Sequence, residues 1–178
     1  MTVTATLVDR VAAAACVSGP FSLADGQVLG SYFDEYRLAA DPRLLREVAA
    51  AMAALVPADA QVLAGIALGG IPLAVALSAA TGLPAAFLRP LPKRYGSRQQ
   101  IEGTPVEGQR VVLVDDVVRS GAQLLAMTRV LRISGAPVTA ALCVLERPLG
   151  GRLLLSKHGV TLHPLLTEAD LPTNGAAS

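Results

Sequence analysis

The chain has 178 residues, a formal net charge of +1 at pH 7, 52% hydrophobic residues and only 3% aromatic residues. This length suits a single domain with a sizeable core, and we expect residues 1–178 to form one. The near-zero net charge argues against a general basic surface for nucleic acid.

The first third of the chain is predicted to form two helices with a turn-rich segment between them. Apolar residues at helical spacing predict a helix over residues 4–17, which Gly19 and Pro20 end. Residues 21–38 are rich in aromatic and turn-forming residues. Asp41 followed by Pro42 offers an N-cap and a proline at the first helical position, and predicts a helix to about residue 56.

No charged residue occurs from residue 60 to residue 88, a stretch long enough to raise the question of a membrane span. Glycines and prolines cut it into pieces too short to cross a bilayer: Gly65, Gly69, Gly70, Pro72, Gly82 and Pro84. We therefore expect no membrane span. A strand at 62–67, a helix at 71–81 and a strand at 85–88 account better for the pattern.

The rest of the chain alternates strands with helices. Residues 89–109 are polar, basic and rich in glycine and proline, and predict a long functional loop. The elements expected after it are a strand at 110–114, a helix at 122–134 ended by Gly135, and strands at 138–145 and 161–165. The tail, residues 173–178, is expected to be disordered. This alternation predicts an α/β fold with a central parallel sheet flanked by helices.

The cysteines and histidines indicate neither a disulfide framework nor a metal site. Cys16 and Cys143 lie far apart in apolar surroundings and are expected to be reduced core residues. His158 and His163 have no cysteine or carboxylate pattern nearby, so structural roles are expected for both. The N-terminus lacks a basic segment followed by an apolar run, so we expect a cytoplasmic protein without a signal peptide.

The strongest functional signal is the segment VVLVDDVVRSGAQ, residues 111–123. Asp115 and Asp116 follow a buried strand, and open α/β sheets bind ligands at that end of their strands. Residues 119–123 would turn backbone N–H groups toward one point at a helix N-terminus, a geometry that binds phosphate. Carboxylates accept hydrogen bonds from sugar hydroxyls, so this segment suits a sugar phosphate. The alternative is a strand-to-turn junction with two solvated aspartates.

This segment resembles the phosphoribosyl pyrophosphate (PRPP) signature of type I phosphoribosyltransferases. Three further segments match the orotate phosphoribosyltransferase family in the same order along the chain. Residues 21–38 resemble its base-binding segment and residues 88–103 its mobile catalytic loop, and Glu146-Arg147 matches a family arginine that reaches the base. The matches cover roughly residues 20 to 150, so joint coincidence is improbable. The family implies a small N-terminal hood over the site, within residues 1–40.

The resemblance also implies a role for each matching residue. The PRPP-binding residues would be Gly69, Gly70, Arg89, Lys93, Asp115, Asp116, Arg119, Ser120, Gly121, Ala122 and Gln123. Of these, Lys93, Asp115 and Asp116 would be catalytic. The base would contact Asp25, Tyr32, Phe33 and Arg147.

By the same resemblance, the protein would join PRPP and a pyrimidine-type base, orotate or a related ring, and release pyrophosphate. Mg²⁺ would be bound with PRPP, with no dedicated metal site on the protein. A homodimer is expected, because the family's catalytic loop crosses to the neighbouring subunit. Ala24, Asp25 and Pro90 replace a lysine, a serine and a second lysine of the family. Two interpretations stay open: an enzyme for a less acidic base, or a catalytically weak regulator that binds PRPP or a nucleotide.

Overall fold

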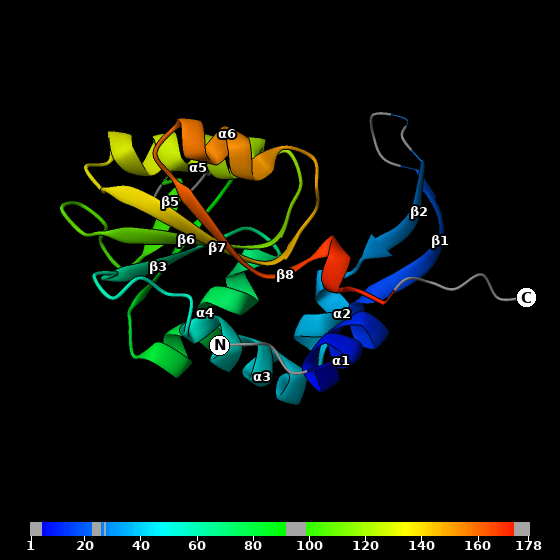
Figure 1. The fold of residues 1–178 in the computed structure, drawn as a ribbon. Coiled ribbons are helices and arrows are strands. Elements are labelled where there is room, and N and C mark those ends of the chain that lie inside the picture. Colours follow the sequence, from blue (N-terminus) through cyan, green and yellow to red (C-terminus); the bar gives the residue numbers. More distant parts are fainter. Residues whose placement is uncertain (1–4, 23–25, 27, 92–98, 173–178) are drawn as a thin grey trace, which may run out of the picture.

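The computed structural model describes residues 5–22, 26, 28–91 and 99–172. Its centre is a six-stranded sheet in the order β5-β4-β3-β6-β7-β8 (Figure 1). The strands are β3 (Val62–Ile66), β4 (Ala85–Leu88), β5 (Ile101–Gly103), β6 (Val111–Val118), β7 (Val138–Glu146) and β8 (Thr161–Thr167). All neighbouring strands in this sheet are parallel except β5, which pairs antiparallel with β4. The predicted α/β fold with a central, mainly parallel sheet is confirmed.

Helices cover both faces of the sheet. They are α1 (Ala5–Ala15), α2 (Glu35–Ala40), α3 (Pro42–Ala53), α4 (Gly70–Thr81), α5 (Ala122–Ile133) and α6 (Gly151–Lys157), with a short 3₁₀ helix η1 (Glu168–Asp170). In Figure 1, α5 and α6 lie on one face, while α1, α3 and α4 lie on the other. Each face has its own apolar core, because alternate residues of a strand point to opposite sides. Val112 and Val114 pack with α3 and α4, whereas Val111 and Leu113 pack with α5 and α6.

The predicted N-terminal hood is an antiparallel hairpin of β1 (Cys16–Ser22) and β2 (Val28–Phe33). It forms a sheet of its own beside the main one (Figure 1). Phe33 is buried at its base, and the rings of Phe21 and Tyr32 lie 5.7 Å apart. The predicted first helix ends two residues early, at Ala15, because Cys16 and Val17 pair with Phe33 and Tyr32 instead.

The second helix begins as predicted. The Asp41 side chain accepts hydrogen bonds from the backbone N–H groups of Arg43 (2.9 Å) and Leu44 (3.1 Å), and Pro42 is the first helical residue. Six elements were not predicted: β1, β2 and α2 in the turn-rich segment, β5 within the expected loop, and α6 and η1. In the described part of the chain, no helix is long and apolar enough to cross a membrane. The predicted disordered tail, residues 173–178, lies outside the described residues.

Candidate active site

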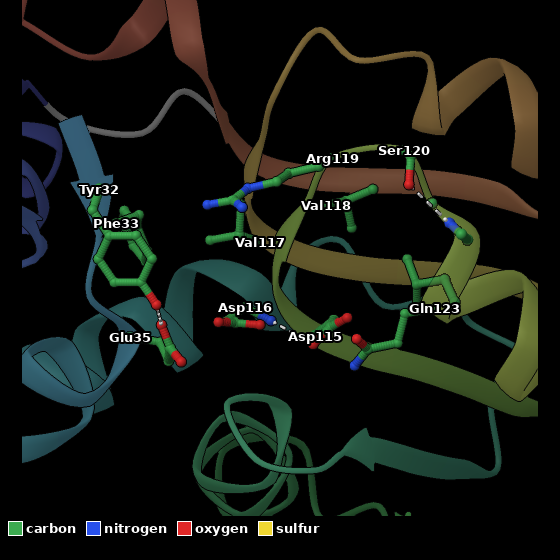
Figure 2. Close-up of a pocket in the computed structure, with 13 residues that line it drawn as sticks. Tyr32, Phe33, Glu35, Asp115, Asp116, Val117, Val118, Arg119, Ser120 and Gln123 are labelled. Atoms are coloured by element: carbon green, nitrogen blue, oxygen red, sulfur yellow. Dashed lines mark hydrogen bonds between the residues drawn. The ribbon is translucent and has the colours of Figure 1, made fainter. Parts of the chain in front are cut away.

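A polar pocket lies where β6 continues past the end of β3. It has a volume of about 310 Å³ and is lined by Tyr32, Phe33, Glu35 and residues 115–124 (Figure 2). The chain leaves β3 through α4 toward β4, and leaves β6 through α5 toward β7 on the other side. The strand order therefore reverses between β3 and β6, and this reversal point is where open α/β sheets bind their ligands.

Asp115 and Asp116 lie inside β6, which corrects the predicted strand end at residue 114. β6 still pairs with β7 there, with Asp115 opposite Cys143 and Val118 opposite Glu146. Its pairing with β3 stops at Val114. The two aspartates thus have a neighbouring strand on one side only, which opens them to the pocket. A sequence pattern of apolar residues cannot reveal this, because the carboxylates interrupt the run without interrupting the strand.

The two carboxylates differ in environment. Asp115 is 5% exposed, whereas Asp116 is half-buried. The Asp115 carboxylate accepts a hydrogen bond from the backbone N–H of Asp116 (3.1 Å). Burial, and then the charge of Asp116, hold the pKa of Asp115 well above its usual range. A ligand hydroxyl that donates to Asp115 would stabilise its ionised form and offset this burial.

The glycine turn after β3 packs directly beneath the aspartates. A Cβ atom on Gly69 would lie 2.7 Å from the carboxyl group of Asp116. A Cβ atom on Gly70 would lie only 2.3 Å from the carbonyl oxygen of Val114. Both positions therefore require glycine for close approach, whatever ligand the turn contacts. Neither glycine is among the described residues that line the pocket.

The phosphate-loop candidates are held by the start of α6. The Gly151 N–H donates to the carbonyl oxygen of Arg119 (3.0 Å), and Gly121 has a φ of 75°. A Cβ atom on Gly121 would lie 3.0 Å from Gly151, so loop and helix are packed backbone against backbone. Residues 119–123 all line the pocket, and Gly121 and Ala122 open the 12-residue helix α5. The predicted strand–loop–helix arrangement is present, with backbone N–H groups at a helix N-terminus.

The side chain of Arg119 points away from the other labelled side chains of its loop. Figure 2 shows its guanidinium extending toward Tyr32, away from Ser120 and Gln123. Burial and nearby carboxylates raise the pKa of Tyr32, and the charge of Arg119 opposes that rise. Arg119 is half-buried and is the only cation among the described residues that line the pocket.

Glu35 is a pocket residue that sequence reasoning missed. The Tyr32 hydroxyl donates to it (3.5 Å), and burial followed by the Asp116 charge raises its pKa. Its neighbour Asp34 caps α2 by accepting from the N–H groups of Tyr36 and Arg37. In the sequence, Glu35 looks like an ordinary acidic residue of the turn-rich segment. Only the fold of the hood turns it toward the pocket.

Four of the remaining candidates lie away from the pocket or outside the described residues. Arg147 is buried, donates to the Glu168 carboxylate (2.6 Å), and is not among the described residues that line the pocket. Arg89 is exposed at the stem of the basic loop, where its N–H donates to the carbonyl oxygen of Gln100 (3.0 Å). Lys93 and Asp25 lie outside the described residues.

Comparisons with known proteins give the family of the chain. The family model of the phosphoribosyl transferase domain matches residues 37–163. An orotate phosphoribosyltransferase from Nocardioides sp. is 40% identical over 171 residues, which are 96% of this chain and 96% of that protein. One from Halobacterium salinarum is 40% identical over 172 residues, 96% of this chain and 98% of that protein.

Two solved structures of the same fold belong to the same family. Orotate phosphoribosyltransferase of Mycobacterium tuberculosis in complex with Fe(III) dicitrate superposes with a TM-score of 0.84 at 28% identity, covering 95% of this chain and 98% of that one. The same enzyme in complex with PRPP gives a TM-score of 0.79 at 26% identity, covering 93% and 96%. On the family model, the relatives and the shared fold together, the chain belongs to the orotate phosphoribosyltransferase family.

Proposed function

We propose that this protein joins PRPP and orotate to give orotidine 5′-monophosphate and pyrophosphate. The observation that carries the proposal is the pair Asp115 and Asp116 beside a phosphate loop at the reversal point of the sheet. Relatives covering 96% of the chain are named orotate phosphoribosyltransferases, and a neighbour of the same fold was solved with PRPP. The alternative of a weakly catalytic regulator has no such support.

In the proposed reaction, the bond between the ribose anomeric carbon and the pyrophosphate oxygen breaks, and its electron pair leaves with pyrophosphate. A bond forms between the same carbon and a ring nitrogen of orotate, which loses its proton. Asp115 and Asp116 would accept hydrogen bonds from the ribose hydroxyls and fix the sugar. Backbone N–H groups of residues 119–123 would hold the 5′-phosphate. Holding both partners in place lowers the barrier by orientation.

The site suits Mg²⁺ that arrives with PRPP. This ion binds through one or two carboxylates together with substrate phosphates and keeps several waters. Asp116, half-buried at the pocket wall, is the residue that would hold it. When bound, the ion offsets charge on the leaving pyrophosphate. We propose, from the family resemblance, that Lys93 adds a further positive charge at that point.

Activity is tested by mixing the protein with Mg²⁺, PRPP and orotate. We expect orotidine 5′-monophosphate and pyrophosphate in equal amounts, measured by chromatography. The double variant Asp115→Asn, Asp116→Asn should lose at least about a hundredfold in kcat/KM, because two hydrogen bonds to charged groups contribute about 1.5–3 kcal/mol each. No product from the wild type would contradict the proposed function.

We also propose a homodimer formed through α4. Val75 and Ala79 lie one turn apart on the same face of α4 and are exposed, with 51% of Val75 accessible. Leu68, in the turn before the helix, is 67% accessible. A helix that is apolar on all sides is expected to be covered on all sides. A cytoplasmic location remains part of the proposal and is supported by two free cysteines.

Val75→Glu should therefore convert the dimer into a monomer, measured by sedimentation at micromolar concentration. A buried carboxylate without a partner is strongly unfavourable at an apolar interface. Ala126→Glu is the matched control, because Ala126 is exposed on α5, on the opposite face of the sheet. A wild type that is monomeric, or a Val75→Glu variant that stays dimeric, would refute this interface.

A further inference from the structure

Glu35 lies at the end of the pocket that faces the hood. It lines the pocket from the first turn of α2, and the Tyr32 hydroxyl donates to its carboxylate (3.5 Å). A Cβ atom built on Gly69 would lie 2.9 Å from Cγ of Glu35 and 2.7 Å from Cγ of Asp116, so the two acidic side chains converge over the same turn. Glu35 is therefore a neighbour of the carboxylates that are proposed to hold the ribose.

The backbone fixes the position of Glu35 before any ligand binds. Asp34 caps α2 by accepting hydrogen bonds from the N–H groups of Tyr36 (3.1 Å) and Arg37 (3.2 Å). This cap orders the first turn of the helix, which carries Glu35. A charge held on an ordered turn needs no rearrangement when it acts on a ligand, which is the condition for electrostatic catalysis.

The charge of Glu35 is not neutralised inside the protein. It forms no ion pair with a residue in the described part of the chain. Arg119, the only cation among the described residues that line the pocket, extends toward Tyr32 (Figure 2). Burial, followed by the charge of Asp116, raises the pKa of Glu35. A positive charge on a ligand at this point would therefore stabilise the Glu35 carboxylate.

The order of side chains along the pocket places the anomeric carbon of PRPP near Glu35. From right to left, Figure 2 shows Gln123 of the phosphate loop, then Asp115, Asp116 and Glu35. In PRPP, the carbon that carries the 5′-phosphate and the anomeric carbon are attached to opposite sides of the ring oxygen. A ribose with its 5′-phosphate in the loop and its hydroxyls on the aspartates therefore directs its anomeric carbon toward the hood.

Departure of pyrophosphate creates a positive charge at this carbon. When the bond between the anomeric carbon and the pyrophosphate oxygen breaks, both electrons leave with pyrophosphate, and the carbon shares a positive charge with the ring oxygen. The charge is lost when the ring nitrogen of orotate, which gives up its proton, forms the new bond. A carboxylate beside the carbon stabilises this transition state more than it stabilises bound PRPP, and such differential binding raises the rate.

We propose that Glu35 is a catalytic residue that stabilises the positive charge on the ribose as pyrophosphate leaves. This inference rests on the proposed function and deepens it, because it adds a third carboxylate to the two that hold the ribose hydroxyls. Glu35 then contributes to the rate of the chemical step and little to the binding of PRPP or orotate.

The first test is the single-turnover rate of Glu35→Gln, with Glu107→Gln as the control for loss of an exposed carboxylate outside this pocket. We expect the rate constant of the Glu35 variant to fall at least about tenfold. The KM values for PRPP and orotate should change less than about threefold, because the lost interaction exists only in the transition state. Glu35→Asp should fall in between, since it keeps the charge and withdraws it by one methylene group.

The second test measures binding and does not depend on turnover. The probe is a pyrrolidine analogue of ribose 5-phosphate, in which a protonated ring nitrogen replaces the ring oxygen, and the reference ligand is ribose 5-phosphate itself. With Mg²⁺ and pyrophosphate present, Glu35→Gln should weaken binding of the cationic analogue at least about tenfold. Binding of ribose 5-phosphate should weaken less than about threefold, both measured by calorimetry.

Several results would overturn the inference. Equal weakening of the two sugars would mean that Glu35 binds ribose hydroxyls in the ground state. A higher Mg²⁺ requirement with unchanged binding of the cationic analogue would assign Glu35 to the metal ion. A faster single turnover would mean that its charge opposes the departure of pyrophosphate, and no change in any constant would remove the role altogether.

Two further comparisons keep these outcomes distinct. If Glu35→Gln has a lowered melting temperature, Glu35→Asp carries the same comparison of the two sugars. A wild type that makes no product from orotate sinks the proposed function and this inference with it, whereas an active wild type with an unaffected Glu35→Gln variant sinks the inference alone.

Discussion

Asp115→Asn is expected to raise the melting temperature of the ligand-free protein and to remove most of its stabilisation by PRPP with Mg²⁺. Burial and the adjacent Asp116 charge disfavour the ionised Asp115 carboxyl group. An amide of the same shape carries no charge and can still accept from the Asp116 N–H. A gain of 1 kcal/mol corresponds to roughly 2–4 °C for a chain of this size. In the wild type, PRPP at a hundredfold excess over Kd should add about 2.7 kcal/mol to the free energy of unfolding. The variant would lose most of this gain, because its amide cannot make the ionic hydrogen bond proposed between Asp115 and a ribose hydroxyl.

The sign of this effect depends on pH. The folded-state pKa of Asp115 is raised, so the folded protein holds a proton there more readily than the unfolded chain does. Wild-type stability therefore gains as pH falls through the raised pKa, and the advantage of the Asn variant shrinks. Melting curves from pH 5 to 8 measure this, with Asp9→Asn, an exposed residue of α1, as the control. A variant that is less stable than the wild type at pH 8 would contradict the argument.

Gly70→Ala is expected to destabilise the fold by about 1–3 kcal/mol or more and to weaken PRPP binding. The added Cβ atom would lie 2.3 Å from the carbonyl oxygen of Val114 and 3.3 Å from Cα of Asp115. Both contacts are with the backbone of β6, which cannot rotate away. The strand must therefore shift, and the aspartates shift with it.

Urea denaturation of Gly70→Ala and Gly30→Ala makes a matched comparison. No atom lies within 4 Å of a Cβ atom built on Gly30, so that substitution should change stability by less than about 0.5 kcal/mol. Equal effects of the two substitutions would show that the destabilisation does not come from the contact with β6.

The regular elements were predictable where a single physical cause dominates. The charge-free stretch from residue 60 to 88 resolved into β3, α4 and β4 nearly as expected, because glycine and proline mark its breaks. Asp41 and Pro42 placed the start of α3 correctly. By contrast, β5 has three residues and owes its existence to pairing with β4, which leaves no periodic pattern in the sequence.

The site residues that are consecutive in the sequence could be predicted. Those that come together only in the folded chain could not. Residues 115–123 are consecutive, and the pocket contains all of them. Glu35 and the Arg147–Glu168 ion pair depend on segments that meet only in the folded chain. The direction of the Arg119 side chain likewise depends on where the hood stands relative to β6 (Figure 2). Sequence spacing carries no information on these contacts or on the direction of this side chain.

The contact between the phosphate loop and the start of α6 has a consequence for synthesis of the chain. Residues 119–121 are fixed by Gly151, thirty residues further on, and the Arg147 N–H also donates to the carbonyl oxygen of Val118 (2.8 Å). A nascent chain that carries both aspartates therefore lacks an ordered phosphate site until residue 151 has left the ribosome. Substrate in the cell can stabilise only the nearly complete chain, and the shorter folding intermediates depend on their apolar core alone.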